Sequence, residues 1–328
     1  MTVDHERTEP ICEADDDFHP AGPDHWWTET SWFSFVVPER DLMAYLYCWN
    51  RPNIACSGGG AIVWDASGEA PWEIPYYDYQ FNLPEAKGDM RDMVWPNGIG
   101  IRCLSPLERY AIDFDKPGAL EIEIEFRGVM DAVLTGGHID QVGRVTGTMN
   151  LRGERSEIDC YAMRDRSWGP RSDRQGMGVR VGYCYGTASP NTGFLLFTDI
   201  EDERDDMSDR YGYVIRDGER CDLTRAERRV ERSGGRPTRI VIEGEDEAGR
   251  AVEITGECRN RLAFTPYPGM FCWLSLVRWE LFGEVAWGEN QDVWPPGSWR
   301  AYLGTERETT DRGTGNPLGS PDGRAELA

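Results

Sequence analysis

Residues 161–171, with the sequence YAMRDRSWGPR, bring three arginines, one carboxylate and one tryptophan into eleven positions. Apolar and polar residues alternate on both sides of this stretch, which predicts a β-strand whose successive side chains point to opposite faces. We therefore expect Arg164, Arg166 and Trp168 to share one face and Asp165 to lie on the other. A strand of this kind can present one ionisable group to a cavity while the side chains on its other face stabilise the fold.

A carboxyl group in an apolar cavity has its charged form destabilised, so it can hold a proton near neutral pH and act as a general acid. Protonation of a C=C bond gives a carbocation, which the faces of Trp and Tyr stabilise by cation–π attraction. Asp165 is the first candidate for such an acid, and Asp199, after the next expected strand, is the second. The alternative role for Asp165 is an ion pair with a neighbouring arginine, which would lower its pKa. The arginines that could form this pair are Arg164, Arg166 and Arg171.

Further candidates flank this stretch. His138, two residues before Asp140, could act as a general base, or it could be a hydrogen-bonded histidine at an interface. Arg166 and Arg171 could clamp a substrate carboxylate or phenolate, or form salt bridges. Trp168 could line a cavity or belong to the core. Other side chains expected to approach the same cavity and contact the substrate are Tyr161, Tyr183, Tyr185, Glu284 and Trp287.

The sequence shows no motif for a metal or a nucleotide. It has four histidines and nine cysteines, with no His-Glu-x-x-His and no Cys-x-x-Cys pair. The glycine run at 58–60 lacks a following Lys-Ser/Thr, and there is no Gly-x-Ser-x-Gly elbow. We therefore expect no cofactor and no metal ion.

Composition limits the partners. The chain has 35 basic and 58 acidic residues, a net charge of −23, which argues against nucleic acids and anionic lipid surfaces. No apolar run reaches the roughly 18 residues of a membrane span. The N-terminus lacks the basic and apolar regions of a signal peptide, and cysteines without a disulfide pattern are typical of a reducing compartment. We expect a cytoplasmic protein with a small hydrophobic substrate. The sequence does not decide the oligomeric state, and a homodimer is one alternative.

The expected fold is all-β. Short aromatic-rich strands recur between turn signals, which is typical of sandwiches and barrels. Residues 120–126 (LEIEIEF) alternate most regularly, and their glutamates should face water. A length of 328 residues suggests two domains. The expected segments are a loose acidic arm (1–22), a first β-domain (23–150), a second β-domain carrying the 161–171 stretch (151–310) and a disordered tail (311–328).

The run RDRSWGPR at 164–171, preceded by HIDQ at 138–141 and GRVTG at 143–147, resembles the motif of the hydroxyneurosporene synthase (carotenoid hydratase) and AttH-like superfamily. This resemblance implies two lipocalin-like antiparallel β-barrel or sandwich domains in tandem, with few helices. Domains of this type enclose an apolar cavity with a few polar groups.

The superfamily pattern reads Asp-His-Ser/Asn-Trp-Gly. Asp165 and Trp168 match it, and Arg166 stands where the pattern has histidine. In the carotenoid hydratases that the chain resembles, an Asp is thought to start the reaction by protonating an alkene. The resemblance therefore implies that Asp165 has this role.

The leading functional hypothesis is a cofactor-independent lyase, of the hydratase or dehydratase type, acting on a hydrophobic unsaturated small molecule of isoprenoid, steroid or aromatic type. One alternative is a non-catalytic carrier of a hydrophobic ligand. Another is a cyclase or isomerase that uses the same cavity. A carboxyl group free of arginine partners in the pocket would favour an enzyme, and its absence would favour a carrier.

Overall fold

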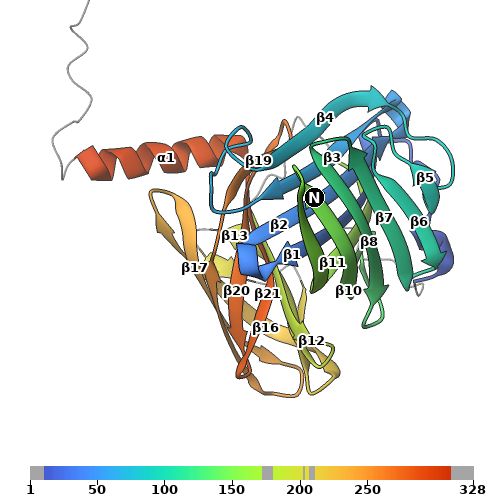
Figure 1. Cartoon of the computed structure of the whole chain (residues 1–328). Helices are drawn as coiled ribbons and strands as arrows, with labels where there is room; N and C mark the ends of the chain where they lie inside the picture. Colours follow the sequence, from blue (N-terminus) through green and yellow to red (C-terminus); the bar gives the residue numbers. More distant parts are fainter. Residues whose placement is uncertain (1–10, 172–179, 202–203, 207–210, 312–328) are drawn as a thin grey trace, which may run out of the picture.

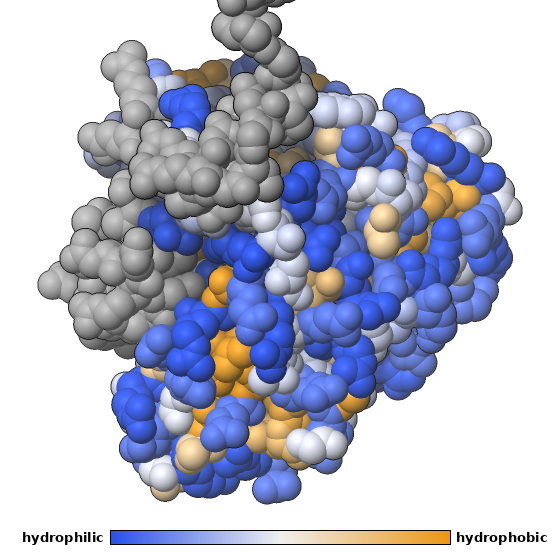
Figure 2. Space-filling model, turned by 90° about the vertical axis from the view of Figure 1, so that its left-hand side faces the viewer, coloured by the Kyte–Doolittle hydropathy of each residue, from blue (hydrophilic) through white to orange (hydrophobic). Residues whose placement is uncertain are grey.

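The computed structural model describes residues 11–171, 180–201, 204–206 and 211–311. Within these ranges the chain is almost entirely antiparallel β-structure, arranged as two β-units that pack against each other (Figure 1). The all-β expectation, with two units and few helices, is confirmed. The described surface in Figure 2 is mostly hydrophilic, as expected for a chain with 58 acidic residues.

The first unit is a curled sheet of eleven described strands in the order β4-β3-β2-β1-β11-β10-β8-β7-β6-β5, with β9 beside β10. Its two halves curve toward each other. As a result, the ring of Tyr76 on β4 lies 6.0 Å from that of Phe114 on β7. The sheet therefore has an inner face and an outer face. Its strands are β1 (Trp27–Val37), β2 (Leu42–Arg51), β3 (Cys56–Trp64), β4 (Tyr76–Pro84), β5 (Asp92–Val94), β6 (Gly100–Ser105), β7 (Arg109–Lys116), β8 (Leu120–Gly128), β9 (Val133–Thr135), β10 (His138–Leu151) and β11 (Glu154–Pro170).

Strand β8 shows how the sequence pattern produces this sheet. Its apolar side chains, Leu120, Ile122, Ile124 and Phe126, are buried, whereas the glutamates between them are exposed or half-buried. Side chains on a strand point alternately to its two faces, so one face packs on the core and the other meets water. The alternation expected over 120–126 is confirmed.

Strands β10 and β11 form one hairpin. Its turn is Arg152-Gly153, and both residues have positive φ (53° and 88°), as the tightest hairpin turns require. On its other side β11 pairs with β1, so the motif strand lies within the first sheet. The expected boundary between residues 150 and 151 therefore does not coincide with the division between the sheets. A two-residue turn keeps both of its strands in one sheet, and the motif belongs to the first unit.

The second unit is a closed barrel. Strand β12 pairs with both β21 and β13, and β15 joins β13 to β16, so eight of its strands complete a ring. The strands of this unit are β12 (Arg180–Ser189), β13 (Thr192–Glu201), β14 (Arg204–Asp206), β15 (Gly212–Arg216), β16 (Glu219–Ser233), β17 (Arg236–Asp246), β18 (Ala251–Cys258), β19 (Leu262–Tyr267), β20 (Met270–Leu281) and β21 (Glu284–Trp294).

The one α-helix of the described residues is α1 (Pro296–Asp311), which projects from the β-units (Figure 1). Its Trp299 stacks on Phe271 of β20 at 4.7 Å and lies 5.3 Å from Trp294. Among the described residues, no helix is long and apolar enough to cross a membrane. Most of the tail expected at 311–328 lies outside the described residues, which end at 311.

The acidic arm differs from the loose segment expected over 1–22. Its described part begins at residue 11 and forms a short 3-10 helix, η1 (Glu13–Asp16), in which Asp15 and Asp16 are buried. Asp16 accepts a hydrogen bond from Arg164 of the motif strand at 2.8 Å and one from the Tyr110 hydroxyl at 2.5 Å. Buried arginines need anionic partners, and the arm supplies them. Two further 3-10 helices in the described part of the chain are η2 (Pro38–Arg40) and η3 (Pro52–Ile54).

The outer face of the first sheet packs on the outside of the barrel through aromatic side chains. Trp32 of β1 lies 6.2 Å from each of the rings of Tyr183 and Tyr185 on β12. The hydroxyls of Tyr47 and Tyr267 meet across the interface at 2.5 Å. One hydrophobic cluster includes buried residues of both units, so the interface is an extension of the core.

Candidate active site

The motif strand β11 separates its side chains between the two faces of the first sheet, as the alternation predicts. The Arg166 guanidinium lies over the Trp168 ring at 5.5 Å on the inner face. Asp165 points to the outer face, where its carboxylate meets His138. The inner face and the outer face therefore have to be considered separately.

On the inner face the arginines hold the arm in place. Arg166 is fully buried, and its Nη2 donates to Glu29 Oε2 at 2.5 Å and to the Asp17 carbonyl at 2.7 Å. Burial alone would raise the pKa of Glu29, but its hydrogen bond with His19 and the charge of Arg166 lower it below its usual value. Trp168 stacks on His19 at 3.7 Å. Two predicted site residues, Arg166 and Trp168, therefore lie on the opposite side of the sheet from Asp165.

On the outer face a histidine lies between two carboxylates. His138 Nε2 lies 2.5 Å from Asp165 Oδ2 and 3.6 Å from Asp140 Oδ1. These groups meet because Asp140 is the cross-strand partner of Asp165 and His138 lies two positions before it on β10. Within the described residues, Asp165 forms its ion pair with His138 and not with an arginine. The arginine pairing left open by the sequence is therefore not the one observed.

Tyrosines from the barrel complete this cluster. Asp140 is fully buried and accepts hydrogen bonds from the hydroxyls of Tyr183, at 2.6 Å, and Tyr211. Burial raises the pKa of Asp140 to about 6, although the charge of His138 acts in the opposite direction. Burial alone would lower the pKa of His138, but the charges of Asp140 and Asp165 raise it to about 9. At neutral pH the imidazole is therefore protonated and lies between two acids.

The cluster also has the donor set of a metal site. His138, Asp140 and Asp165 each offer one ligand atom, and these atoms lie within 4.8 Å of one another. A metal ion would need the imidazole in its neutral form, whereas the two carboxylates favour its protonated form. A proton and a divalent cation would therefore compete for the same three side chains.

A second buried carboxyl faces the same interface from the barrel. Glu289 on β21 lies opposite Tyr185 of β12 and is fully buried. Burial raises the pKa of Glu289 to about 8, and the charge of Asp165 acts in the same direction. Its Oε2 accepts a long hydrogen bond of 3.4 Å from Gln291, and its Oε1 has no partner among the described residues. This group is a neutral carboxylic acid at pH 7.

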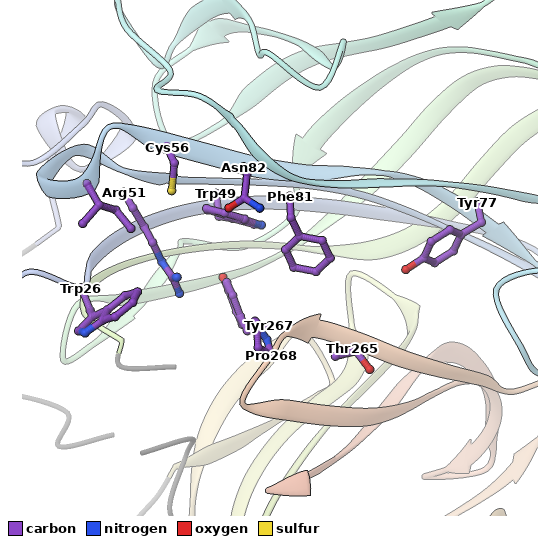
Figure 3. Close-up of a pocket in the computed structure, with 11 residues that line it drawn as sticks. Trp26, Trp49, Arg51, Cys56, Tyr77, Phe81, Asn82, Thr265, Tyr267 and Pro268 are labelled. Carbon is purple, nitrogen blue, oxygen red and sulfur yellow. The ribbon is translucent and has the colours of Figure 1, made fainter. Parts of the chain in front are cut away.

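An aromatic cavity of about 540 Å³ opens between the two units (Figure 3). It lies between strands β2–β4 of the first sheet and the β19–β20 hairpin of the barrel. No Asp or Glu is among the described residues that line it. Those residues are Trp26, Trp49, Arg51, Ile54, Cys56, Tyr77, Phe81, Asn82, Thr265, Tyr267 and Pro268.

A chain of hydrogen bonds leads from this cavity toward the carboxylate cluster. Tyr267 lines the cavity, and its hydroxyl is hydrogen-bonded to that of Tyr47 at 2.5 Å. The same hydroxyl accepts a hydrogen bond from Arg171 Nη1 at 3.4 Å. Arg171 Nη2 in turn donates to the Ser167 hydroxyl. Ser167 is two residues from Asp165 on the same face of β11. Arg171 therefore connects the two parts of the candidate site.

The remaining predicted residues are less closely tied to the cluster. Asp199 is half-buried on β13, two residues beyond Phe197, whose ring lies 6.2 Å from that of His138. Tyr161 is half-buried on β11, four residues before Asp165. Glu284 is exposed at the start of β21, where it accepts a hydrogen bond from Thr192.

Tyr185 and Trp287 extend the interface beyond the cluster. The Tyr185 hydroxyl bonds Ser34 of β1 at 2.8 Å, and the half-buried Trp287 lies on the same strand face as Glu289. The structure therefore brings together Asp165, His138, Tyr183, Tyr185 and Arg171. It does not join Arg166, Trp168 or Glu284 to this group.

A family model described as a domain of unknown function, DUF7064, matches residues 13–291. The chain belongs to the DUF7064 family. The match spans the arm, the first sheet and nearly the whole barrel. Residues of this DUF7064 member that the sequence analysis did not select for the site are Tyr47, Tyr211, Tyr267 and Glu289. Glu289 lies in the run WGENQD, whose polar character gives no sign of burial.

Two solved structures resemble this DUF7064 protein. The protein assigned as AttH in Nitrosomonas europaea matches with 11% sequence identity and a TM-score of 0.50, covering 81% of this chain and 91% of that one. Kievitone hydratase from Nectria haematococca matches with 9% identity and a TM-score of 0.42, covering 82% of this chain and 88% of that one. No curated protein matches the sequence. The expected resemblance to the AttH and carotenoid hydratase superfamily is confirmed at the level of the fold.

Proposed function

We propose that this DUF7064 protein is a cofactor-independent lyase, of the hydratase or dehydratase type, that acts on a hydrophobic unsaturated small molecule. The observation that carries the proposal is the cluster of Asp165, His138 and the fully buried Asp140, in which Asp165 forms an ion pair with His138 and, among the described residues, with no arginine. Titratable groups with opposed environments in one site are typical of acid–base catalysis.

The cluster suits the proton transfers of such a reaction. Hydration of a C=C bond adds a proton to one carbon and water to the other, and the added water then loses a proton. We assign to Asp165, which the ion pair with His138 holds in place, the role of accepting the proton from the added water. Asp140 holds the imidazole from the other side. The reverse sequence of steps would eliminate water.

The aromatic cavity supports the proposed substrate class. Its rings, including Trp49, Phe81 and Tyr267, surround an open space in Figure 3 and would bury the apolar part of a small molecule. Aromatic faces also stabilise a developing carbocation. Arg171 and Tyr267 would then lie between the bound molecule and Asp165.

A hydration assay in H₂¹⁸O tests this proposal, with geraniol, 4-vinylphenol and testosterone as probes of the isoprenoid, aromatic and steroid classes. We expect one probe to gain solvent oxygen and Asp165→Asn to lower that rate about 10²-fold or more, with an unchanged circular dichroism spectrum. The matched control is Asp159→Asn, an exposed carboxylate on the same strand that pairs with Arg144. Full activity in Asp165→Asn would refute the proposal. A product isomeric with the probe and free of ¹⁸O would indicate a cyclase or isomerase.

One observation favours a second candidate, a carrier of hydrophobic ligands. The described lining of the cavity contains no carboxyl group, so the cavity itself holds no acid or base of that kind. A carrier would bind a probe tightly and release it unchanged after long incubation. Mass spectrometry of ligands that copurify with the protein separates the two candidates, because a carrier retains a ligand and an enzyme forms a product.

A further inference from the structure

Seven carboxyl groups are buried in the described residues, and six of them lie beside a basic side chain. Asp16 pairs with Arg164 at 2.8 Å and Glu29 with Arg166 at 2.5 Å, whereas Asp140 lies beside His138. The other three pairs are Asp15 with His19, Asp246 with Arg250, and Asp292 with Arg228 and Arg232. The seventh group, Glu289, has no such partner in the described part of the chain. A buried carboxyl without a cation is costly to ionise, so Glu289 carries a proton.

The side chain of Glu289 is directed at the interface between the two units. Its cross-strand neighbours on the barrel are Tyr185 and Leu276, which belong to the hydrophobic cluster shared with the first sheet. Tyr185 reaches β1 through its hydroxyl. Glu289 therefore faces the same layer of the molecule as Asp165, and the two groups interact electrostatically.

We infer that Glu289 is the proton donor of the reaction, and that it acts with the Asp165–His138 pair as acid and base from two facing sheets. This inference rests on the function proposed above. Glu289 would give its proton to one alkene carbon and become a carboxylate. Water would add to the other carbon, and its released proton would pass to the Asp165 carboxylate. Return of that proton to Glu289 through solvent closes the cycle, so no other reactant is needed.

Among the ionisable groups of the barrel at this part of the interface, Glu289 is the one expected to change its protonation state between pH 5 and 9. The ionisable groups that face it are Tyr45, Tyr185, Cys272 and Asp165. Burial raises the pKa of both tyrosines and of the cysteine well above their usual values, so these groups stay neutral between pH 5 and 9. The pKa of Glu289, raised by burial to about 8, then sets the upper pH limit of proton donation.

The test measures protonation and turnover separately, with Glu289→Gln as the variant. Folding holds a proton on Glu289 that the unfolded chain releases above its ordinary pKa of 4.5. For each pH unit between 5 and 8, the unfolding equilibrium constant of the wild type should therefore rise by a factor about ten times larger than the factor for Glu289→Gln. Equal slopes in urea titrations would overturn the inference, because Glu289 would then carry no proton.

Turnover on a probe converted by the wild type should fall about 10²-fold or more in Glu289→Gln. Glu289→Asp should keep the pH slope and part of the rate, and Glu280→Gln, an exposed change on the neighbouring strand β20, should keep both. A wild type that converts a probe while Glu289→Gln converts it equally well refutes the donor role and leaves the proposed function standing. A wild type that converts no probe refutes the proposed function, and the donor role falls with it.

Discussion

Three side chains of the candidate site bind protons more tightly in the folded protein than in the unfolded chain. They are His138, with a pKa of about 9, Glu289 at about 8 and Asp140 at about 6. A raised pKa means that stability is highest below the ordinary pKa and is lost as the pH rises through the folded value. All three contributions have the same sign, so the site makes the protein less stable toward alkaline pH.

The contribution of His138 can be isolated. Its pKa rises from 6.5 to about 9, so its interactions are fully present below pH 6.5 and disappear as the pH approaches 9. The shift corresponds to about 3 kcal/mol of unfolding free energy. We expect the histidine ring signals to titrate above pH 8 in the wild type and at lower pH in Asp165→Asn, as followed by NMR. Titration of His138 near 6.5 in the wild type would contradict this prediction.

Part of this site could be predicted from the sequence, and part could not. The alternation around Arg164-Asp165-Arg166 was enough to place Asp165 apart from the arginines on either side of it. The His138–Asp140 pair was recognisable as a base candidate from its spacing. Glu289 was not, because its burial depends on the barrel packing against another sheet, and no local pattern encodes that contact.

At the scale of elements, regular strands follow from the sequence and their partners do not. The pattern of β8 predicts both the strand and its buried face. The arm and α1 were missed for another reason. Asp15 and Asp16 look like solvated charges, but the positions of Arg164 and Arg166 in the sheet draw the arm inward. Helix α1 is anchored to β20 and β21 by Trp299 and has little apolar patterning of its own.

The arm should therefore contribute to stability through one buried pair. Asp16→Ala leaves the Arg164 guanidinium buried without its carboxylate, and we expect a loss of about 3–5 kcal/mol of unfolding free energy. Glu13→Ala, an exposed change in the same short helix, should cost less than about 0.5 kcal/mol. Urea unfolding measures both values. Equal values for the two variants would mean that the arm contributes nothing through this pair.

At the scale of the whole molecule, the two units share one core. Buried aromatic and aliphatic residues of the first sheet and the barrel form a single cluster, and Tyr47–Tyr267 joins them within it. Polar contacts at the edge of the interface also hold the two units together. Arg259 of the barrel donates to the Asp41 carboxylate at 2.8 Å, and Asn260 donates to the Asp41 carbonyl at 2.7 Å. Separation would expose a large aromatic surface on each unit. The site depends on this arrangement, because its acids come from both sides of the interface.

We therefore expect the chain to unfold in one cooperative transition. Tryptophan fluorescence and far-ultraviolet circular dichroism should give the same urea midpoint, since neither unit can keep its apolar face covered alone. Tyr267→Ala removes a buried ring that contacts Tyr47 across the interface and should lower the unfolding free energy by about 3–5 kcal/mol while the transition stays single. Arg278→Ala, a change at a largely exposed ion pair on the barrel, is the control and should cost less than about 1 kcal/mol. Two separate midpoints in the wild type would show that the sheets fold independently, and the two acids of the proposed site would then have no fixed geometry.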